Sequence, residues 1–409
     1  MEKRILVLGK NYSTPLGVIR SLGKAGYTVD MLYISKKVNE AEIVKASRFL
    51  SRLVIVDEEK DEKVLAALMK EFSAEENDYL LFPTDDYSAS FIDRYAEQLK
   101  GYRMQRVLED SVTRLMDKSV QNALARELGF LTPKEWILSL EDAAAEIPAE
   151  VPFPCFLKPM ISAKGGKLGI RKCETREELE EGLRYMREKE PHRSVLIQEF
   201  LNIKREYTIG GICNDQKVYI PAVICKTRIA QYNRGVTLSG ILISNKKLSC
   251  MREVEEYLRR VRFVGMFDLE ILETEEGFYF GELNLRCGGP SYAYYLGGIN
   301  LPEMTAELIY NGVFRPEGRK VVLGEQFLNN KVVWEDYANR FISKGKRKAL
   351  YEQIPLTLLY DEEDPEPEEV FDRIMPAVYC KKRFKLGIKK KIPTKLLKIY
   401  QTKKVAGNK

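Results

Sequence analysis

The sequence predicts a mixed α/β and α+β protein with more than one domain, and three observations carry this prediction. The chain has 409 residues, which is more than one ordinary core of about 150 residues needs. Strand and helix patterns alternate over residues 1–110, which is typical of a parallel sheet covered by helices. A run of successive strands with fewer helices follows over residues 153–283, which is typical of an α+β domain.

The alternation over residues 1–110 predicts a Rossmann-like domain. Apolar residues at helical spacing separate the first two strands, which makes a strand–helix–strand unit with parallel strands. The polar residues 83–86 follow the last strand, at the edge where open α/β sheets bind ligands. The predicted elements are strand 5–8, strand 28–34, helix 64–72 and strand 79–82.

The first strand ends at Gly9, and the loop after it is KNYSTPLG. This loop lacks the G-x-G-x-x-G spacing that lets the backbone approach a pyrophosphate. The sequence therefore argues against a domain that binds NAD or FAD. Two interpretations of the loop at 9–15 stay open, a site for a smaller ligand and a simple turn of the chain.

A second domain is predicted over residues 111–325, with a flexible lid subdomain at about 130–198. It opens with a helix at 111–129, which Ser111 caps and Gly129 ends. The other predicted elements are strands 153–158, 169–173, 195–200, 206–211, 218–225, 265–272 and 278–283, and helix 177–188.

The available residue types restrict the chemistry. The one histidine, His192, stands in a polar stretch, and we expect it to lie on the surface. A Ser-His-Asp triad would have to use it, and a histidine-rich metal site cannot be built. The seven cysteines are scattered without a C-x-x-C pair, which indicates a reducing compartment and neither disulfides nor a zinc site. Lysine, arginine and carboxylates remain, and these groups handle phosphate and magnesium.

Two predicted strands carry acids in an alternating pattern. In FYFGELNLR, Glu282 and Asn284 share one face of the strand, and their oxygens suit Mg²⁺ held together with substrate phosphates. In GMFDLEIL, Asp268 and Glu270 share a face as well. Arg286 lies on the side of Asn284 if the strand continues, where it could stabilise charge on a transferred phosphoryl group. The alternative is a solvated sheet face that carries acids.

Two lysines and a glycine-rich loop are typical of phosphate binding. Lys158 ends an apolar strand, where an unpaired ammonium would be costly to bury, so a phosphate partner is favoured. The loop at 161–169 contains three glycines, and its backbone N–H groups could cover phosphates. Lys118 lies on the helix that Ser111 opens. The alternative for Lys158 is a surface lysine at the end of a strand, and the alternative for the loop at 161–169 is an ordinary hairpin tip.

The order of these pieces resembles the ATP-grasp superfamily, in the branch of carboxylate–amine ligases and carbamoyl-phosphate synthases. A helix lysine is followed by a strand lysine with a glycine loop, an E-F-L hinge at 199–201, an acid strand and an E-x-N strand with an arginine. GELNLR is the most specific piece and is similar to the family's E-x-N-P-R, with Leu285 in place of proline. The resemblance covers about residues 1–320 and implies a two-lobed ATP-grasp domain behind the Rossmann-like domain.

The resemblance also implies roles for single residues. Between the hinge and the acid strand, Lys226, Arg228 and Arg234 could contact the γ-phosphate or an anionic acceptor, or lie on a solvated ribbon, and Arg228 is preferred. Asp268 stays open as a replacement for Glu270 or as its companion. The implied residues are Lys118, Lys158, Ser162, Gly165, Gly166, Glu199, Leu201 and Glu206 for ATP; Glu270, Glu282 and Asn284 for one or two Mg²⁺ ions, with Mn²⁺ as a substitute; and Arg286 and Arg228 for catalysis.

The reaction that the resemblance implies is amide-bond formation. ATP phosphorylates a carboxylate, an amine attacks the acyl phosphate, and ADP and phosphate leave; positioning and charge neutralisation suffice, without a histidine base. Two alternatives stay open, a non-catalytic or regulatory ATP-binding module and a carboxylase of the biotin-carboxylase type, against which the lone His192 argues. The expected partners are small acids and amines in the cytoplasm, and similar proteins are often homodimers.

The chain ends in a C-terminal extension, 326–380, with the acidic stretch DEEDPEPEEVFD, and a basic tail, 381–409. The tail carries twelve lysines and arginines and no acid, while the whole chain has a net charge of +6, so the rest is acidic. An acidic body argues against a protein that coats nucleic acid. Apolar residues interleave with the tail lysines, so the tail could contact anionic lipid at the inner membrane face. The alternatives are a disordered tail and one paired with residues 361–372.

Overall fold

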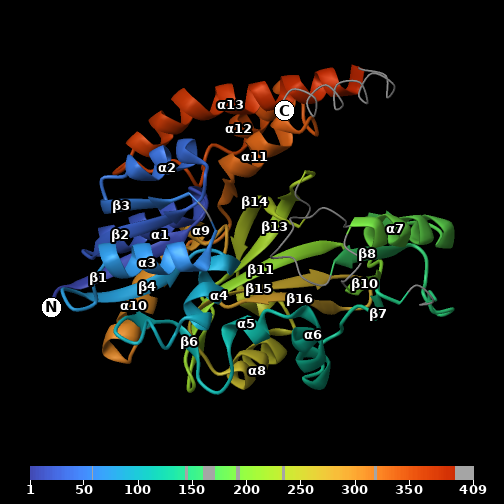
Figure 1. The fold of residues 1–409 in the computed structure, drawn as a ribbon, viewed down its shortest axis with the longest axis horizontal. Helices are drawn as coiled ribbons and strands as arrows, with labels where there is room; N and C mark the ends of the chain where they lie inside the picture. The colour runs from blue at the N-terminus through green and yellow to red at the C-terminus, as the bar shows by residue number, and fades with distance from the viewer. Residues whose placement is uncertain are drawn as a thin grey trace, which may run out of the picture.

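The structure, a computed structural model, describes residues 1–57, 59–142, 146–159, 171–189, 194–232, 235–316 and 320–391. These residues form three sheets. Figure 1 shows the N-terminal sheet on one side, the smallest sheet on the other and the largest between them, with the helices of the C-terminal extension across the top. None of the helices in the described ranges is both long and apolar enough to cross a bilayer.

The N-terminal sheet is parallel, with the strand order β3-β2-β1-β4-β5, which confirms the Rossmann-like prediction. Successive residues of the first strand enter different cores: Ile5 and Val7 pack on one face, and Leu6 and Leu8 on the other. Helices cover both faces, so the strand is apolar throughout. The elements are β1 (Lys3–Gly9), α1 (Ser13–Lys24), β2 (Thr28–Ile34), α2 (Val38–Lys45), β3 (Leu50–Val56), α3 (Asp61–Glu71), β4 (Asp78–Pro83), α4 (Asp86–Arg94) and β5 (Arg103–Met104).

The largest sheet is antiparallel and has the order β16-β15-β11-β13-β14-β17, with β12 on β11 and β6 on β15. Its strands are β6 (Arg106–Val107), β11 (Arg205–Cys213), β12 (Val218–Tyr219), β13 (Val223–Ile229), β14 (Thr237–Ile243), β15 (Phe263–Glu273), β16 (Phe278–Asn284) and β17 (Gln326–Leu328). Its helices are α5 (Val112–Leu115), α6 (Lys118–Glu127), α8 (Met251–Val261), α9 (Tyr292–Leu296) and α10 (Leu301–Asn311), with a short 3₁₀ turn, η2 (Asn245–Lys247).

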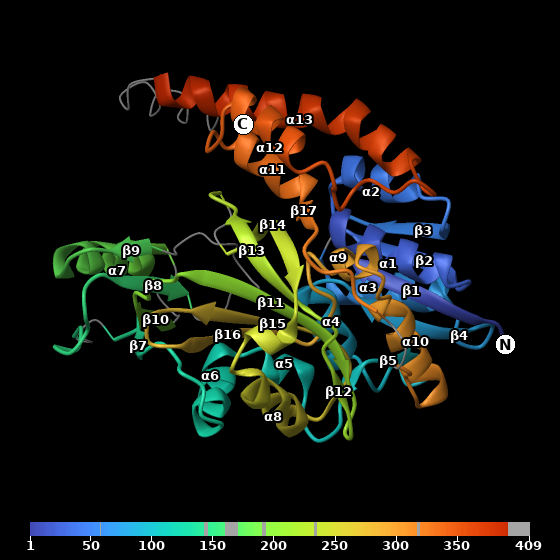
Figure 2. The ribbon, with the colours of Figure 1, turned by 180° about the vertical axis from the view of Figure 1, so that it is seen from behind.

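The smallest sheet lies at the far end of the molecule from the N-terminal sheet (Figures 1 and 2). It is antiparallel with the order β7-β10-β8-β9, and α7 packs against it. Its elements are β7 (Glu135–Ser139), β8 (Cys155–Pro159), β9 (Arg171–Cys173), α7 (Arg176–Lys189) and β10 (Ser194–Glu199). These are the residues predicted as a lid subdomain; the domain boundaries themselves stay predictions.

The C-terminal extension connects the other parts. Its strand β17 pairs with β14, and its helices are α11 (Asn330–Ala338), α12 (Lys344–Gln353) and α13 (Glu366–Lys391). Figure 2 shows α13 running over α2 at one end and over α11 and α12 further along. Asp336 of α11 is fully buried and accepts from the backbone N–H groups of Gln231 (2.9 Å) and Tyr232 (2.8 Å), so the extension holds the turn after β13.

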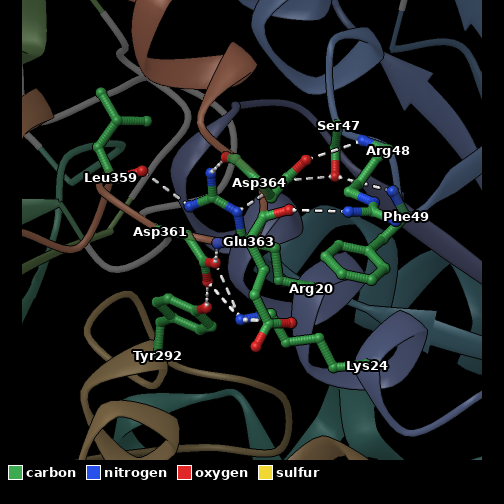
Figure 3. A network of polar contacts seen from close by, with 10 residues as sticks. All are labelled: Arg20, Lys24, Ser47, Arg48, Phe49, Tyr292, Leu359, Asp361, Glu363 and Asp364. Atoms are coloured by element: carbon green, nitrogen blue, oxygen red, sulfur yellow. Dashed lines mark hydrogen bonds and ion pairs between the residues drawn. The ribbon is translucent and has the colours of Figure 1, made fainter.

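The acidic stretch at 361–372, which runs into the start of α13, is part of this connection (Figure 3). Asp364 and Arg20 of α1 are both fully buried, and Nε of Arg20 donates to Oδ2 of Asp364 at 2.8 Å. Asp364 also accepts from the hydroxyl of Ser47 (2.7 Å) and the backbone N–H of Arg48 (2.8 Å). Lys24 pairs with Asp361 at 2.9 Å. These acids of the stretch at 361–372 therefore bind the N-terminal domain; residues 392–409 of the basic tail lie outside the described residues.

Two predicted elements are wrong in their extent. The predicted helix 111–129 is two helices, because the Asp117 side chain accepts from the N–H groups of Ser119 (2.8 Å) and Val120 (3.4 Å) and starts α6 anew; Ser111 caps α5 as expected. The predicted strand 218–225 is divided between β12 and β13, because Pro221 has no N–H to donate to a ladder.

Candidate active site

Four polar residues predicted as metal ligands or their alternatives face one another on β15 and β16. In the register of this pair, Asp268 lies opposite Asn284 and Glu270 opposite Glu282. The register shifts by one residue after Glu270, next to Gly281. A Cβ atom at Gly281 would lie 2.7 Å from the Glu270 carbonyl oxygen, so a glycine is needed for this close approach. The two strands thus bring three carboxylates and an amide together, as the alternating pattern predicts.

Two lysines neutralise this acidic cluster. Nζ of Lys118, at the start of α6, lies 3.6 Å from Oε2 of Glu282. The almost fully buried Nζ of Lys226, on β13, donates to Glu270 (3.0 Å), Glu206 (3.2 Å) and the Gly235 carbonyl (2.7 Å). Burial lowers the pKa of Lys226, but the carboxylates of Glu270 and Glu206 outweigh burial and raise it. Each predicted magnesium carboxylate is therefore paired with an ammonium group.

Asp268 is the most deeply buried acid of the cluster. Burial raises its pKa to about 7, although the nearby Arg286 guanidinium acts in the opposite direction. A Cβ atom at Gly288 would lie 2.2 Å from an Asp268 oxygen, so the glycine after the strand makes room for this carboxyl. The choice between Asp268 and Glu270 as metal ligand stays open.

Arg286 connects the cluster to the N-terminal domain. Its guanidinium donates to Asp86 Oδ1 (2.7 Å) and to Asn284 Oδ1 (3.1 Å). Asp86 begins α4, at the carboxyl edge of β4, and its neighbour Asp85 accepts from the backbone N–H of Lys10 at 2.9 Å. The polar residues predicted to bind a ligand at this edge thus lie beside the predicted catalytic arginine.

The smallest sheet carries the second predicted phosphate lysine. Lys158 of β8 donates to the side chain of Gln198 on the neighbouring β10. Gln198 donates to Glu135 (2.6 Å), which also accepts from Asn122 of α6 (2.7 Å), one turn after Lys118. This chain of contacts links the strand of Lys158 to the helix of Lys118.

The predicted adenine hinge follows β10. The backbone N–H of Glu199 donates to the Lys134 carbonyl (3.0 Å), and Oε1 of Glu199 accepts from the backbone N–H of Lys134 (2.8 Å). The Leu201 carbonyl accepts from the N–H of Ile203 (3.1 Å). The hinge therefore lies where the chain passes from the smallest sheet to the largest, ahead of Glu206.

Other predicted residues lie elsewhere. Arg228 is exposed and donates to Gln353 of α12 at 3.3 Å, because a bulge after Lys226 breaks the alternation that would place both on one face.

Among the described residues, no three acids, histidines or cysteines form a metal-binding group by themselves, so Asn284 or substrate oxygens would be needed. The predicted site residues Ser162, Gly165, Gly166 and Arg234 lie outside the described residues. His192 lies outside them as well.

Of the cations predicted between the hinge and the acid strand, Lys226 contacts the acidic cluster and the preferred Arg228 does not. The signal that identifies Lys158, a lysine at the end of an apolar run, applies equally to Lys226 in VICK. The pattern that places residues 83–86 at a ligand-binding edge does not link Asp86 to Arg286, because only the packing of two domains brings these two side chains together.

We expect a Lys226→Met variant to lose about 2 kcal/mol of unfolding free energy, because two partly buried carboxylates lose a charged hydrogen bond. Mg²⁺ should raise the melting temperature of this variant more than that of the unchanged protein, since the ion can replace the missing charge. Thermal unfolding with and without Mg²⁺ measures both effects. Lys246→Met, at an exposed lysine, is the control; equal responses to Mg²⁺ in the two variants would contradict the expectation.

Comparison with known proteins shows similarity over part of the chain. Residues 124–235 match the family model described as the D-ala D-ala ligase C-terminus. The D-alanine–D-alanine ligase of Geobacillus thermodenitrificans is 32% identical over 233 aligned residues, which cover 51% of this chain and 62% of the ligase. The formate-dependent phosphoribosylglycinamide formyltransferase of Bacteroides thetaiotaomicron is 25% identical over 196 aligned residues, which cover 47% of this chain and 50% of the transferase. The chain thus spans less than two thirds of these relatives.

Solved structures share the fold over more of the chain. The L-amino acid ligase from Bacillus licheniformis has a TM-score of 0.59 at 16% identity, covering 77% of this chain and 78% of the ligase. The biotin carboxylase domain dimer of the Hydrogenobacter thermophilus 2-oxoglutarate carboxylase, in complex with MgADP, ADP and bicarbonate, has a TM-score of 0.58 at 17% identity, covering 80% and 73%. At such identities the likeness shows the fold alone.

Proposed function

From the ATP-grasp fold that this chain has, we propose that it is an ATP-dependent carboxylate–amine ligase, which forms an amide bond through an acyl phosphate and releases ADP and phosphate. The observation that carries the proposal is the register of β15 and β16, in which Glu270 and Glu282 lie opposite each other and each pairs with a lysine. Acids gathered in this way repel one another unless cations lie among them.

The residues present fit a magnesium ion held with ATP. Carboxylate and amide oxygens are the hard ligands that Mg²⁺ prefers, and Glu270, Glu282 and Asn284 would hold it, with Asp268 as the alternative. Bound there, the ion would neutralise phosphate charge during transfer. Lys118, now paired with Glu282, can turn its ammonium group to the phosphates once a metal takes over that carboxylate.

The chain's own cations would do the remaining work. Arg286 is held in place by Asp86 and Asn284, so its guanidinium can stabilise charge on the acyl phosphate without first having to be ordered. Lys226 fixes Glu206, which we propose for ribose, relative to Glu270. Lys158 would bind phosphate from the smallest sheet. The small substrates would then bind beside Asp86 and Arg286, after the carboxyl end of β4.

We expect purified protein with MgATP to release ADP and phosphate only, or much faster, when the right acid and amine are both present. A coupled ADP-release screen over amino acids, small acids and peptides, with product masses measured, tests this. AMP and pyrophosphate as products would contradict the proposal. ATP binding without ADP release across the whole panel would favour the non-catalytic module, and turnover that needs bicarbonate and biotin would favour the carboxylase.

Location and assembly stay proposals. A ligase for small acids and amines would act in the cytoplasm. Contact of residues 381–409 with an anionic membrane and formation of a homodimer stay predictions from the sequence, and most of the basic tail lies outside the described residues.

A further inference from the structure

A pocket of about 590 Å³ lies within the C-terminal extension, between α11, α12 and α13. Asn330 and Trp334 line it from α11, Arg347 and Tyr351 from α12, and Glu368 from α13. None of these residues belongs to the candidate active site on β15 and β16. The volume is enough for a small molecule of two amino-acid residues or fewer.

Polar groups without partners gather at this pocket. Two buried side-chain atoms of its lining, Asn330 Oδ1 and Arg347 Nη1, have no hydrogen-bond partner in the described part of the chain. Asn330 is only 5% exposed. Leaving a buried polar group unpaired costs about 1–3 kcal/mol, so two such groups at one place favour a ligand that pairs with them.

The pocket has acids from α13 and mostly cations from α12, where Lys344, Arg347 and Lys348 line it and Glu352 pairs with Lys348 at 3.5 Å. On α13, Glu368 and Asp372 lie one turn apart, and burial raises the pKa of both; the charge of Asp372 raises that of Glu368 further. On α12, the Arg347 guanidinium stacks on the Trp334 ring at 3.6 Å, which fixes its plane. The Arg347 charge lowers the pKa of Asp372, but by less than burial raises it. The pocket therefore presents acceptors on one wall and a fixed cation on another.

We propose that this pocket binds a small zwitterion of the α-amino acid or dipeptide type. The ammonium group would lie between Glu368, Asp372 and the unpaired Asn330 oxygen, and the carboxylate would take the open donors of Arg347. The Trp334 ring, which is 8% exposed and also stacks on Tyr379, holds the Arg347 guanidinium in place for this contact. The proposal rests on the pocket alone and does not depend on the proposed ligase reaction.

The test uses the full chain without nucleotide. Thermal unfolding is followed with each proteinogenic L-amino acid and with L-alanyl-L-alanine, and ligands that raise the melting temperature are titrated by calorimetry. We expect at least one of these ligands to bind, and its N-acetyl and carboxamide derivatives, which each lack one charge, to bind about ten-fold more weakly or worse. Failure of every probe to bind, or equal binding of the derivatives, would overturn the proposal.

A variant separates this pocket from the nucleotide site. Glu368→Gln removes a charge that repels Asp372, so the variant should fold at least as well as the unchanged protein. We expect it to lose about ten-fold or more in affinity for the zwitterion while its affinity for MgATP stays the same. Glu369→Gln, at the exposed neighbour, should change neither affinity. Unchanged zwitterion binding by Glu368→Gln would place the ligand elsewhere and overturn the proposal, whatever the ADP-release screen gives.

Discussion

A Glu282→Ala variant is expected to lose about 10²-fold or more of the ADP release that MgATP supports, because the substitution removes a charged group from the place where phosphate charge must be neutralised. Glu282 lies opposite Glu270 in the strand register and 3.6 Å from Lys118. Without it, only one of the two facing carboxylates remains to hold a metal ion. The steady-state rate of ADP formation measures the loss.

A binding measurement makes this prediction independent of the unknown substrates. Calorimetric titration with ATP, with and without Mg²⁺, should show that Mg²⁺ strengthens ATP binding by the unchanged protein and hardly by Glu282→Ala. The control is Glu275→Ala, because that side chain is 77% exposed and pairs with Lys204 at the turn after β15. If Glu282→Ala kept its activity and its Mg²⁺-dependent ATP binding, the assignment of β15 and β16 as the magnesium site would be wrong.

Local patterns were sufficient to predict most of the strands near the site. The alternation of acids and apolar residues predicts β15 and β16, and the register confirms that Glu270 and Glu282 face each other. The strand–helix alternation also predicts the parallel N-terminal sheet. These features depend on neighbours in sequence, whose side-chain periodicity follows from strand and helix geometry.

Features that depend on distant partners could not be predicted. The bulge after Lys226 turns Arg228 outwards, and no residue pattern marks that bulge. Asp86 approaches Arg286 only because two domains pack together, across 200 residues of sequence. The composition of the acidic stretch is typical of a solvent-exposed segment. Asp364 is nevertheless fully buried against Arg20, 344 residues away in the sequence. Composition alone gives no indication of which acids in such a stretch find a buried partner.

An Asp364→Ala variant is expected to lose about 3–5 kcal/mol of unfolding free energy, because it leaves the Arg20 guanidinium buried without its counter-charge. Both side chains are fully buried, so water cannot replace the lost carboxylate. The hydroxyl of Ser47 and the N–H of Arg48 lose their acceptor as well. Urea unfolding followed by tryptophan fluorescence measures the change, and Trp334 reports from the extension itself.

Two further variants separate the buried charge from the other contacts of this network. Glu363→Ala removes a neighbouring acid that is 66% exposed and lies 3.6 Å from Lys24, so it should change stability little. The double variant Arg20→Met with Asp364→Leu should recover part of the loss, because it removes the isolated charge and fills its space with apolar atoms. Recovery should stay incomplete, since Ser47 and Arg48 still lack an acceptor and the carbonyls of Leu359 and Asp364 lose the donors of Arg20. A double variant as unstable as Asp364→Ala would show instead that the hydrogen bonds to Ser47, Arg48 and the two carbonyls, and not the uncompensated charge of Arg20, account for the loss.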